Sequence, residues 1–208
     1  MNEFLERTKT SLIIGICAAV LFLYFPPMVI SALLIACAGW ILLDEWPKIA
    51  RHMGFTGWLL AIFYIILPFE ALIYLNRTNQ PALIMMCILV ASCDIGSYIF
   101  GSLFGKHLLA PDISPKKTWE GLWGGIFTTI ITFYGISLFM GSQESLTYSI
   151  FAGIPIALLA IAGDLFESFL KRNADIKDAG SLLPGHGGLL DRFDSLIFVV
   201  TFYYYFLL

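Results

Sequence analysis

Apolar runs alternate with short polar or Pro- and Gly-containing stretches along the whole of this 208-residue chain. Seven runs can be read, at 11–25, 28–43, 57–75, 82–103, 121–140, 147–170 and 194–208. A helix needs ~20 apolar residues to cross the ~30 Å hydrocarbon core of a bilayer, so each run predicts a membrane span, with the first two and the last short. The pattern therefore predicts an all-α fold, a polytopic integral membrane helix bundle of about seven transmembrane helices in one domain over 1–208.

The composition points in the same direction. Hydrophobic residues make up 59% of the chain and charged residues 13%, whereas soluble domains have about 25% charged residues. We expect the four cysteines to be packing residues, because they lie inside apolar runs without CxxC spacing or a nearby histidine. They are Cys17, Cys37, Cys87 and Cys93. No nucleic-acid partner is expected.

Basic residues are distributed unevenly between the two sides of the seven-span arrangement. Arg77 alone falls on one side. The other side receives Arg7, Lys9, Lys48, Arg51, Lys106, Lys116, Lys117, Lys171, Arg172, Lys177 and Arg192. Because Lys and Arg near helix ends are retained in the cytoplasm, we expect a cytoplasmic N-terminus and an outside C-terminus. The long loops 44–56, 104–120 and 171–193 are then all cytoplasmic.

Glu70, Asp94 and Asp164 fall inside predicted spans, where each costs ~2.5–3.5 kcal/mol to insert and is a functional candidate. Glu70 has no polar neighbour on its helix face, and its role stays open between function and packing. Asp94 shares a face with Ser97, Tyr98 and Gly101. Such a stripe either joins helices or lines a polar cavity, and the carboxylate favours the cavity.

Asp164 is the third and begins a longer polar stripe. Glu167, Ser168 and Lys171 follow it at i+3, i+4 and i+7, which places all four on one helix face. Residues 156–162 before it are apolar, so the stripe starts within the predicted bilayer. This position favours a site over a solvated surface stripe.

The following loop, 173–192, combines glycines with charge. The turn Pro-Gly-His-Gly-Gly at 184–188 lets backbone N–H groups approach an anion, and the nearby basic residues suit a polyphosphate. A plain turn between helices is the alternative for 184–188. Asp191 and Asp194 lie three residues apart at the start of the last helix, where hard carboxylate oxygens suit a divalent cation.

A second cytoplasmic loop contains Ser-Pro-Lys-Lys-Thr at 114–118. Its hydroxyl and ammonium groups suit the phosphate of a nucleotide or lipid. Lysines beside a membrane also act as orientation signals or bind anionic headgroups.

These motifs resemble the CTP:phosphatidate cytidylyltransferases, also called CDP-diacylglycerol synthases, in a short form with less chain at the N-terminal end. The residues that match the family signature are Ser168, Lys171-Arg172, Lys177-Asp178, His186-Gly187-Gly188 and Asp191-Arg192-Phe193-Asp194. The segment 94–125, which includes Ser-Pro-Lys-Lys-Thr-Trp-Glu-Gly at 114–121, is similar to the family as well.

The resemblance implies a single transmembrane catalytic domain in phospholipid biosynthesis. It implies transfer of a cytidylyl group from CTP to phosphatidate, giving CDP-diacylglycerol and pyrophosphate. It also implies Mg²⁺ as cofactor, with a second cation such as K⁺ allowed, and a homodimer among membrane lipids. The site would face the cytoplasm in a multi-pass protein of the plasma (inner) membrane.

Roles follow from the same resemblance and from the residue chemistry. The expected catalytic residues are Asp164, Asp191, Lys171 and Ser168. The expected metal ligands are Asp164 and Asp191, with Asp94 and Asp194 as further ligands or as groups beside them. The expected substrate-binding residues are Arg172, Lys177, Asp178, His186, Gly187, Gly188, Arg192, Ser114, Lys116, Lys117 and Thr118.

Alternatives remain open at this stage. A related enzyme could use another acceptor, such as an archaeal ether lipid or a polyprenyl phosphate, because nothing in the motifs senses the lipid tail. An ion-coupled transporter would also carry intramembrane carboxylates, but the charges here gather at one membrane face. A non-catalytic scaffold would not need the dense Asp-Gly-His-Arg pattern.

Overall fold

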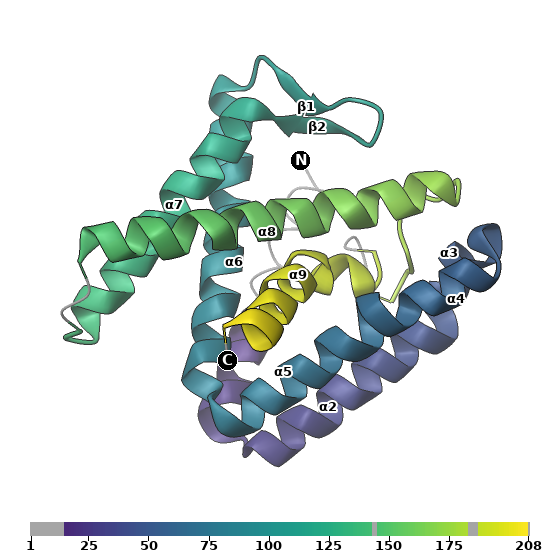
Figure 1. The fold of residues 1–208 in the computed structure, drawn as a ribbon, viewed down its shortest axis with the longest axis horizontal. Helices are drawn as coiled ribbons and strands as arrows, with labels where there is room; N and C mark the ends of the chain where they lie inside the picture. The colour runs from purple at the N-terminus through teal and green to yellow at the C-terminus, as the bar shows by residue number, and fades with distance from the viewer. Residues whose placement is uncertain (1–14, 143–144, 183–186, 208) are drawn as a thin grey trace. The chain divides into compact units, whose positions relative to one another are not determined.

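The computed structural model describes residues 15–142, 145–182 and 187–207. A helix at Gly15–Tyr24 comes first. It is followed by α2 (Pro27–Trp40), the π-helical turn η1 (Ile41–Glu45), α3 (Trp46–Met53), α4 (Phe55–Ala61), a second π-helical turn η2 (Ile62–Ile66), α5 (Leu67–Thr78), α6 (Gln80–Phe104), β1 (Leu108–Ala110), β2 (Ser114–Thr118), α7 (Trp119–Phe139), α8 (Leu146–Asn173) and α9 (Leu190–Phe206) (Figure 1).

Five continuous helical stretches are long and apolar enough to cross a membrane. They are Pro27–Met53, Phe55–Thr78, Gln80–Phe104, Trp119–Phe139 and Leu146–Asn173. With the shorter helix Gly15–Tyr24 and α9, the described part of the chain has the seven helical stretches that the apolar runs predicted. The all-α prediction is confirmed, and the chain is a multi-pass membrane protein. The short hairpin β1–β2 was not predicted.

Each π-helical turn lies immediately before a proline-containing helix start. Pro47 follows η1 and Pro68 follows η2, both in the first two positions of the next helix. Proline has no N–H to donate, and its ring collides with the carbonyl four residues earlier. The helix therefore widens by one residue just ahead of the ring instead of breaking.

The predicted loop over 44–56 is wrong for this reason. The helix passes through η1 and continues to Met53. Gly54 makes the turn, with a φ of 59° that favours glycine. Across this turn the indole N–H of buried Trp46 donates to the carbonyl of Gly57 at 3.2 Å, so α3 and α4 pack closely.

The chain divides into two compact units. The first consists of Met1–Ile84, Leu170–Phe193 and Val200–Leu208. Its helices α2 and α5 lie side by side (Figure 1). The fully buried side chain of Asn76 joins them at one end, where Nδ2 donates to the Pro27 carbonyl at 2.7 Å and to the Ser31 hydroxyl at 3.0 Å.

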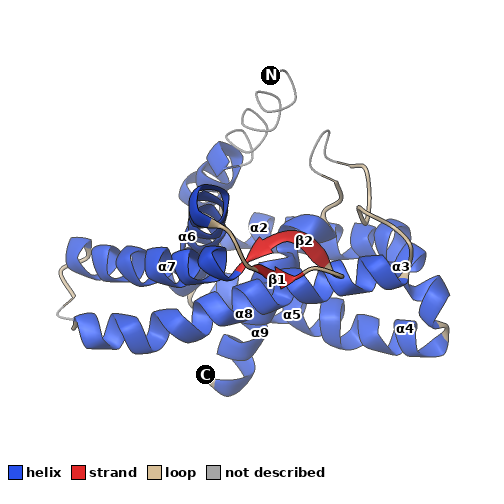
Figure 2. Ribbon diagram, turned by 90° about the horizontal axis from the view of Figure 1, so that it is seen from above, coloured by secondary structure: helices blue, strands red, loops and turns tan. Residues whose placement is uncertain are grey.

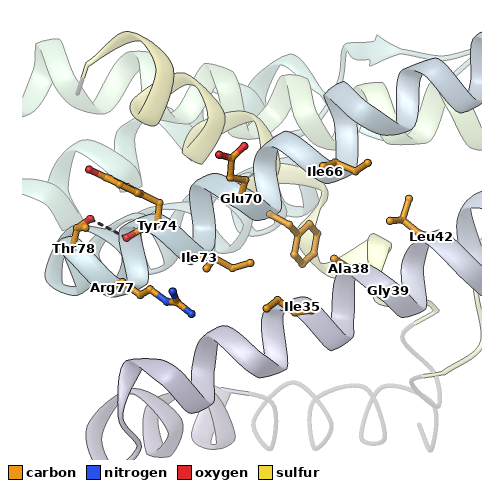
Figure 3. Close-up of a pocket in the computed structure, with 11 residues that line it drawn as sticks. Ile35, Ala38, Gly39, Leu42, Ile66, Glu70, Ile73, Tyr74, Arg77 and Thr78 are labelled. Atoms are coloured by element: carbon orange, nitrogen blue, oxygen red, sulfur yellow. Dashed lines mark hydrogen bonds between the residues drawn. The ribbon is translucent and has the colours of Figure 1, made fainter.

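An apolar groove of about 620 Å³ runs between α2 and α5. Figure 3 shows Ile35 and Ile73 on its walls and Arg77 extending toward α2. Glu70 also borders the groove, but its carboxylate points away from α2 (Figure 3). There it accepts a hydrogen bond from the Tyr205 hydroxyl at 3.4 Å. Glu70 therefore has a tyrosine partner in the same unit.

The second unit consists of Met85–Phe169 and Asp194–Val199. Helices α6 and α7 approach closely here, since a Cβ on Gly121 would lie 2.8 Å from the Ser97 carbonyl oxygen. The antiparallel hairpin β1–β2 connects them (Figure 2, red). Its last residue, Thr118, caps α7 by accepting a hydrogen bond from the Gly121 N–H at 3.1 Å. The cap fixes where the hairpin ends and the helix begins.

The amide bridge at Asn76 gives a test of the first unit. Asn76→Ala leaves the buried Ser31 hydroxyl and the Pro27 carbonyl without this donor, so we expect a loss of about 1–2 kcal/mol in the free energy of unfolding. Thermal unfolding of the purified protein in detergent measures the loss. Thr78→Val is the control, because the exposed Thr78 hydroxyl bonds to the Tyr74 carbonyl of its own helix. Equal midpoints for the two variants would contradict the bridge.

Candidate active site

A first group of polar residues lies in the second unit and is called the hairpin cluster here: Lys117, Asp164 and Ser168. Lys117 comes from β2 and its Nζ lies 2.6 Å from Oδ2 of Asp164 on α8. The Ser168 hydroxyl, one helical turn further along α8, donates to Asp164 Oδ1 at 3.5 Å. About a third of the Asp164 side chain is exposed (34%). Its carboxylate is therefore both paired and accessible.

The base of the hairpin is closed by Glu120. Its Oε2 accepts the backbone N–H groups of Lys106 and His107 at 3.2 and 3.3 Å. Its Oε1 lies 2.7 Å from the His107 ring nitrogen Nδ1. These contacts tie the end of α6 to the start of α7, at the base of the hairpin that carries Lys117. The sequence analysis did not single out Glu120, although its place after the lysine-rich motif was visible.

A second group lies in the first unit and is called the loop cluster here: Glu45, Lys171 and Asp191. Lys171 Nζ lies 2.6 Å from Asp191 Oδ1, and both side chains are nearly buried, with 12% and 5% exposed. Asp191 Oδ2 accepts the N–H groups of Ala179 and Gly188 at 3.2 and 2.6 Å. Asp191 thus neutralises a lysine and holds two points of the loop at once.

Glu45 was missed by the sequence analysis. It lies in η1 and is fully buried, whereas the neighbouring Asp44 is exposed and pairs with Lys48 at 2.8 Å. Its two carboxylate oxygens accept the N–H groups of Leu189 and Leu190 at 2.7 and 2.8 Å. The available signal was a carboxylate between an apolar run and Trp-Pro, at the start of a segment taken for a loop.

The other predicted loop residues differ in exposure. Arg172, Lys177, Asp178 and Arg192 are exposed. Gly187 has a φ of 79°, which requires glycine. His186 lies outside the described residues. The Gly188 N–H, expected to approach a bound anion, is donated to Asp191, so it binds a carboxylate of the protein.

The predicted polar stripe on α6 is divided between two environments. Ser97 and Gly101 face α7 closely, which is the helix-joining role that the sequence analysis set second. Asp94 is exposed. Asp194 belongs to the second unit with Asp94, and its backbone lies against Gly163, where a Cβ would come within 2.5 Å of the Asp194 carbonyl oxygen. Ser114 is half-buried in β2, and Lys116 is exposed.

The carboxylates that could bind a magnesium ion, Asp164 and Asp191, each form an ion pair with a lysine. In the described part of the chain, no three His, Cys, Asp or Glu side chains form a ready metal-binding group. Mg²⁺ usually takes one or two protein carboxylates and completes its shell with phosphates and water. The accessible, hard oxygens of Asp164 fit that requirement. Asp191 fits it less well, because Oδ2 already accepts two N–H groups.

Comparison with known proteins identifies the family. The sequence pattern of the cytidylyltransferase family matches residues 7–208, which include both clusters. The chain belongs to the cytidylyltransferase family.

Three relatives in this comparison are 34–39% identical to the chain. It is 34% identical over 201 residues to the uncharacterized protein YnbB of Escherichia coli (strain K12), covering 94% of this chain and 66% of YnbB. It is 39% identical over 151 residues to a phosphatidate cytidylyltransferase of Bacillus subtilis (strain 168), covering 71% and 56%. A phosphatidate cytidylyltransferase of Rickettsia bellii (strain RML369-C) is 36% identical over 188 residues, covering 86% and 79%. The chain thus spans just over half to about four fifths of these relatives.

The loop cluster of this family member can be tested by removing one charge. Lys171→Met leaves the buried Asp191 carboxylate without its ammonium partner, which we expect to cost about 3–5 kcal/mol in the free energy of unfolding. The double variant Lys171→Met/Asp191→Asn should recover part of this loss, because the uncompensated charge is gone. Thermal unfolding in detergent is the measurement.

Lys48→Met is the matched control for that variant. Lys48 is also paired with an aspartate, but at an exposed site, so its removal should change stability by at most about 0.5 kcal/mol. A Lys171→Met protein as stable as Lys48→Met would contradict the buried pair.

Proposed function

We propose that this chain transfers a cytidylyl group from CTP to phosphatidate, giving CDP-diacylglycerol and pyrophosphate. The observation that carries the proposal is the family match over 7–208, together with relatives named phosphatidate cytidylyltransferase. The residues that the match includes have suitable chemistry, since paired ammonium and carboxylate groups occur in both clusters.

In the proposed reaction a phosphate oxygen of phosphatidate attacks the α-phosphorus of CTP. The new P–O bond forms the diphosphate bridge of CDP-diacylglycerol, and the bond between the α-phosphorus and the bridging oxygen to the β-phosphate breaks. Pyrophosphate leaves with that oxygen. Phosphate monoesters are largely ionised near neutral pH, so the attacking oxygen needs no dedicated base. The protein's task is to position and neutralise charge.

The hairpin cluster carries charges that suit this task. Lys117 and Asp164 neutralise each other at 2.6 Å. A metal-chelated triphosphate would offer each of them an alternative partner, a phosphate for the ammonium and the cation for the carboxylate. Bound Mg²⁺ would supply neutralisation of the triphosphate. The exposed Arg172, Lys177 and Arg192 are proposed to bind phosphates.

The proposal includes the membrane in which the protein lies and the side of that membrane on which the site lies. We infer a plasma-membrane protein whose clusters face the cytoplasm, because all Lys and Arg residues other than Arg77 fall on one side of the predicted spans. Within the first unit, Arg77 lies at the Pro27 end of α2, and Lys48 and Arg51 lie toward the other end of the same continuous helix. A homodimer is proposed on the family resemblance alone.

A direct assay tests the function. Purified protein in detergent, given labelled CTP, Mg²⁺ and phosphatidate, should form a lipid-soluble cytidine product. Asp164→Asn should lower the turnover by about 10²-fold or more, because it removes a charge that acts on the triphosphate and its metal. Tyr148→Phe, at an exposed position of α8 far along the helix from Asp164, should stay within about twofold of wild type.

Parallel reactions with a polyprenyl phosphate or an archaeal ether-linked phosphatidate examine the other acceptors. Product with one of these and none with phosphatidate would replace the proposed acceptor. No labelled lipid with any acceptor would reject cytidylyl transfer.

Removal of divalent cations gives a second test. Treatment with EDTA should abolish product formation, and added Mg²⁺ should restore it in wild type, because the triphosphate then regains its neutralising cation. In Asp164→Asn, raising Mg²⁺ should recover part of the lost rate if that carboxylate binds the ion. Full activity of wild type in EDTA would show that no divalent cation is needed.

A further inference from the structure

The start of α9 is held by a side chain that is distant in the sequence. α9 begins at Leu190, and its own N-cap residue, Leu189, provides no side-chain cap. The carboxylate of Glu45 replaces that cap, with Oε1 accepting from Leu189 N–H at 2.7 Å and Oε2 from Leu190 N–H at 2.8 Å. A carboxylate at a helix N-terminus satisfies orphan donors and interacts favourably with the helix dipole.

Two glycines lie so close to this carboxylate that neither position has room for a side chain. A Cβ added to Gly180 would lie 2.6 Å from Glu45 Oε1, and one added to Gly188 would lie 2.5 Å from the same atom. No real Cβ contact is that short. Glu45 itself has no exposed surface. The loop therefore packs closely against the carboxylate at both glycines, and two of its backbone N–H groups bind it.

Glu45 acts on Asp191 and Lys171, the other two members of the loop cluster, through the chain itself. The two residues whose N–H groups it holds immediately precede Asp191, and Gly188, which packs against it, donates its own N–H to Asp191. Any shift of the Glu45 carboxylate displaces the backbone that sets the direction of Asp191 and hence of Lys171.

We propose that Glu45 is a positioning residue for the reaction, which holds Gly188, Leu189 and Leu190, and with them Asp191, in their working place from the first long helix of the described chain. The inference rests on the proposed function for its kinetic part. It assigns Glu45 no contact with substrate. Its role is to accept hydrogen bonds from the backbone N–H groups of Leu189 and Leu190, which would otherwise favour a loop position in contact with water.

Three substitutions separate the interactions. Glu45→Gln keeps the shape but turns an amide NH₂ toward one of the two N–H donors. Gly180→Ala changes no polar group and only crowds Oε1. Glu45→Gln leaves one N–H without an acceptor, and Gly180→Ala forces the carboxylate away from its donors. Both should lower kcat by about tenfold to a hundredfold, with less than about threefold change in KM for CTP. Asp44→Asn is the matched control at the adjacent exposed carboxylate and should stay within about twofold.

A double-mutant cycle tests whether Gly180 acts through Glu45. Glu45→Ala removes the carboxylate with which the added methyl group collides, so Gly180→Ala should cost nothing further in that background. Equal losses from Gly180→Ala in both backgrounds would overturn the proposal. So would a Glu45→Gln enzyme with wild-type kcat.

Hydrogen exchange provides a readout that does not need activity. In wild type the Leu189 and Leu190 amides should be protected, and Glu45→Gln should speed their exchange by about tenfold or more while the amides of α7 stay unchanged. Unchanged exchange at 189–190 would overturn the inference even if activity falls. If wild type makes no cytidine lipid but exchange behaves as expected, the proposed function fails and the placement of the loop by Glu45 stands.

Discussion

Backbone N–H groups that are buried near a membrane need acceptors, because an unsatisfied donor there costs several kcal/mol. In the segment before α9 this requirement is met by two buried carboxylates. Glu45 accepts from Leu189 and Leu190, and Asp191 accepts from Ala179 and Gly188. The acid groups of this unit are thus part of its folding.

Each cluster contains a lysine and an aspartate that compensate each other's charge before any substrate arrives. Lys171 with Asp191, and Lys117 with Asp164, each lie 2.6 Å apart. Such pairing lowers the cost of keeping charge close to hydrocarbon. The two pairs differ in exposure, since the Asp191 side chain is 5% exposed and that of Asp164 is 34% exposed. The buried Lys171–Asp191 pair suits a structural role. The partly exposed Lys117–Asp164 pair suits a site where each side chain can change its partner for a charged ligand.

Much of the fold was predictable from the sequence, because helix spans follow from long apolar runs. The signature residues from Ser168 to Asp194 also pointed to the family correctly. What could not be predicted depends on contacts between distant segments. Glu45 reaches residues more than a hundred positions away, and nothing in its local pattern shows this. The bond from the Gly188 N–H to Asp191 is local, but the glycine pattern did not show it either.

The π-helical turn before Pro47 also fixes the phase of the first long helix. Each residue of an α-helix turns the chain by about 100°, and η1 inserts its extra residue between α2 and α3. Losing one residue here would rotate α2, with the groove wall that it forms, relative to Trp46 and the segment beyond it. Insertions and deletions of single residues between Ile41 and Pro47 should therefore be tolerated far less than point substitutions. The length of this short stretch is thus a constraint on the evolution of the chain.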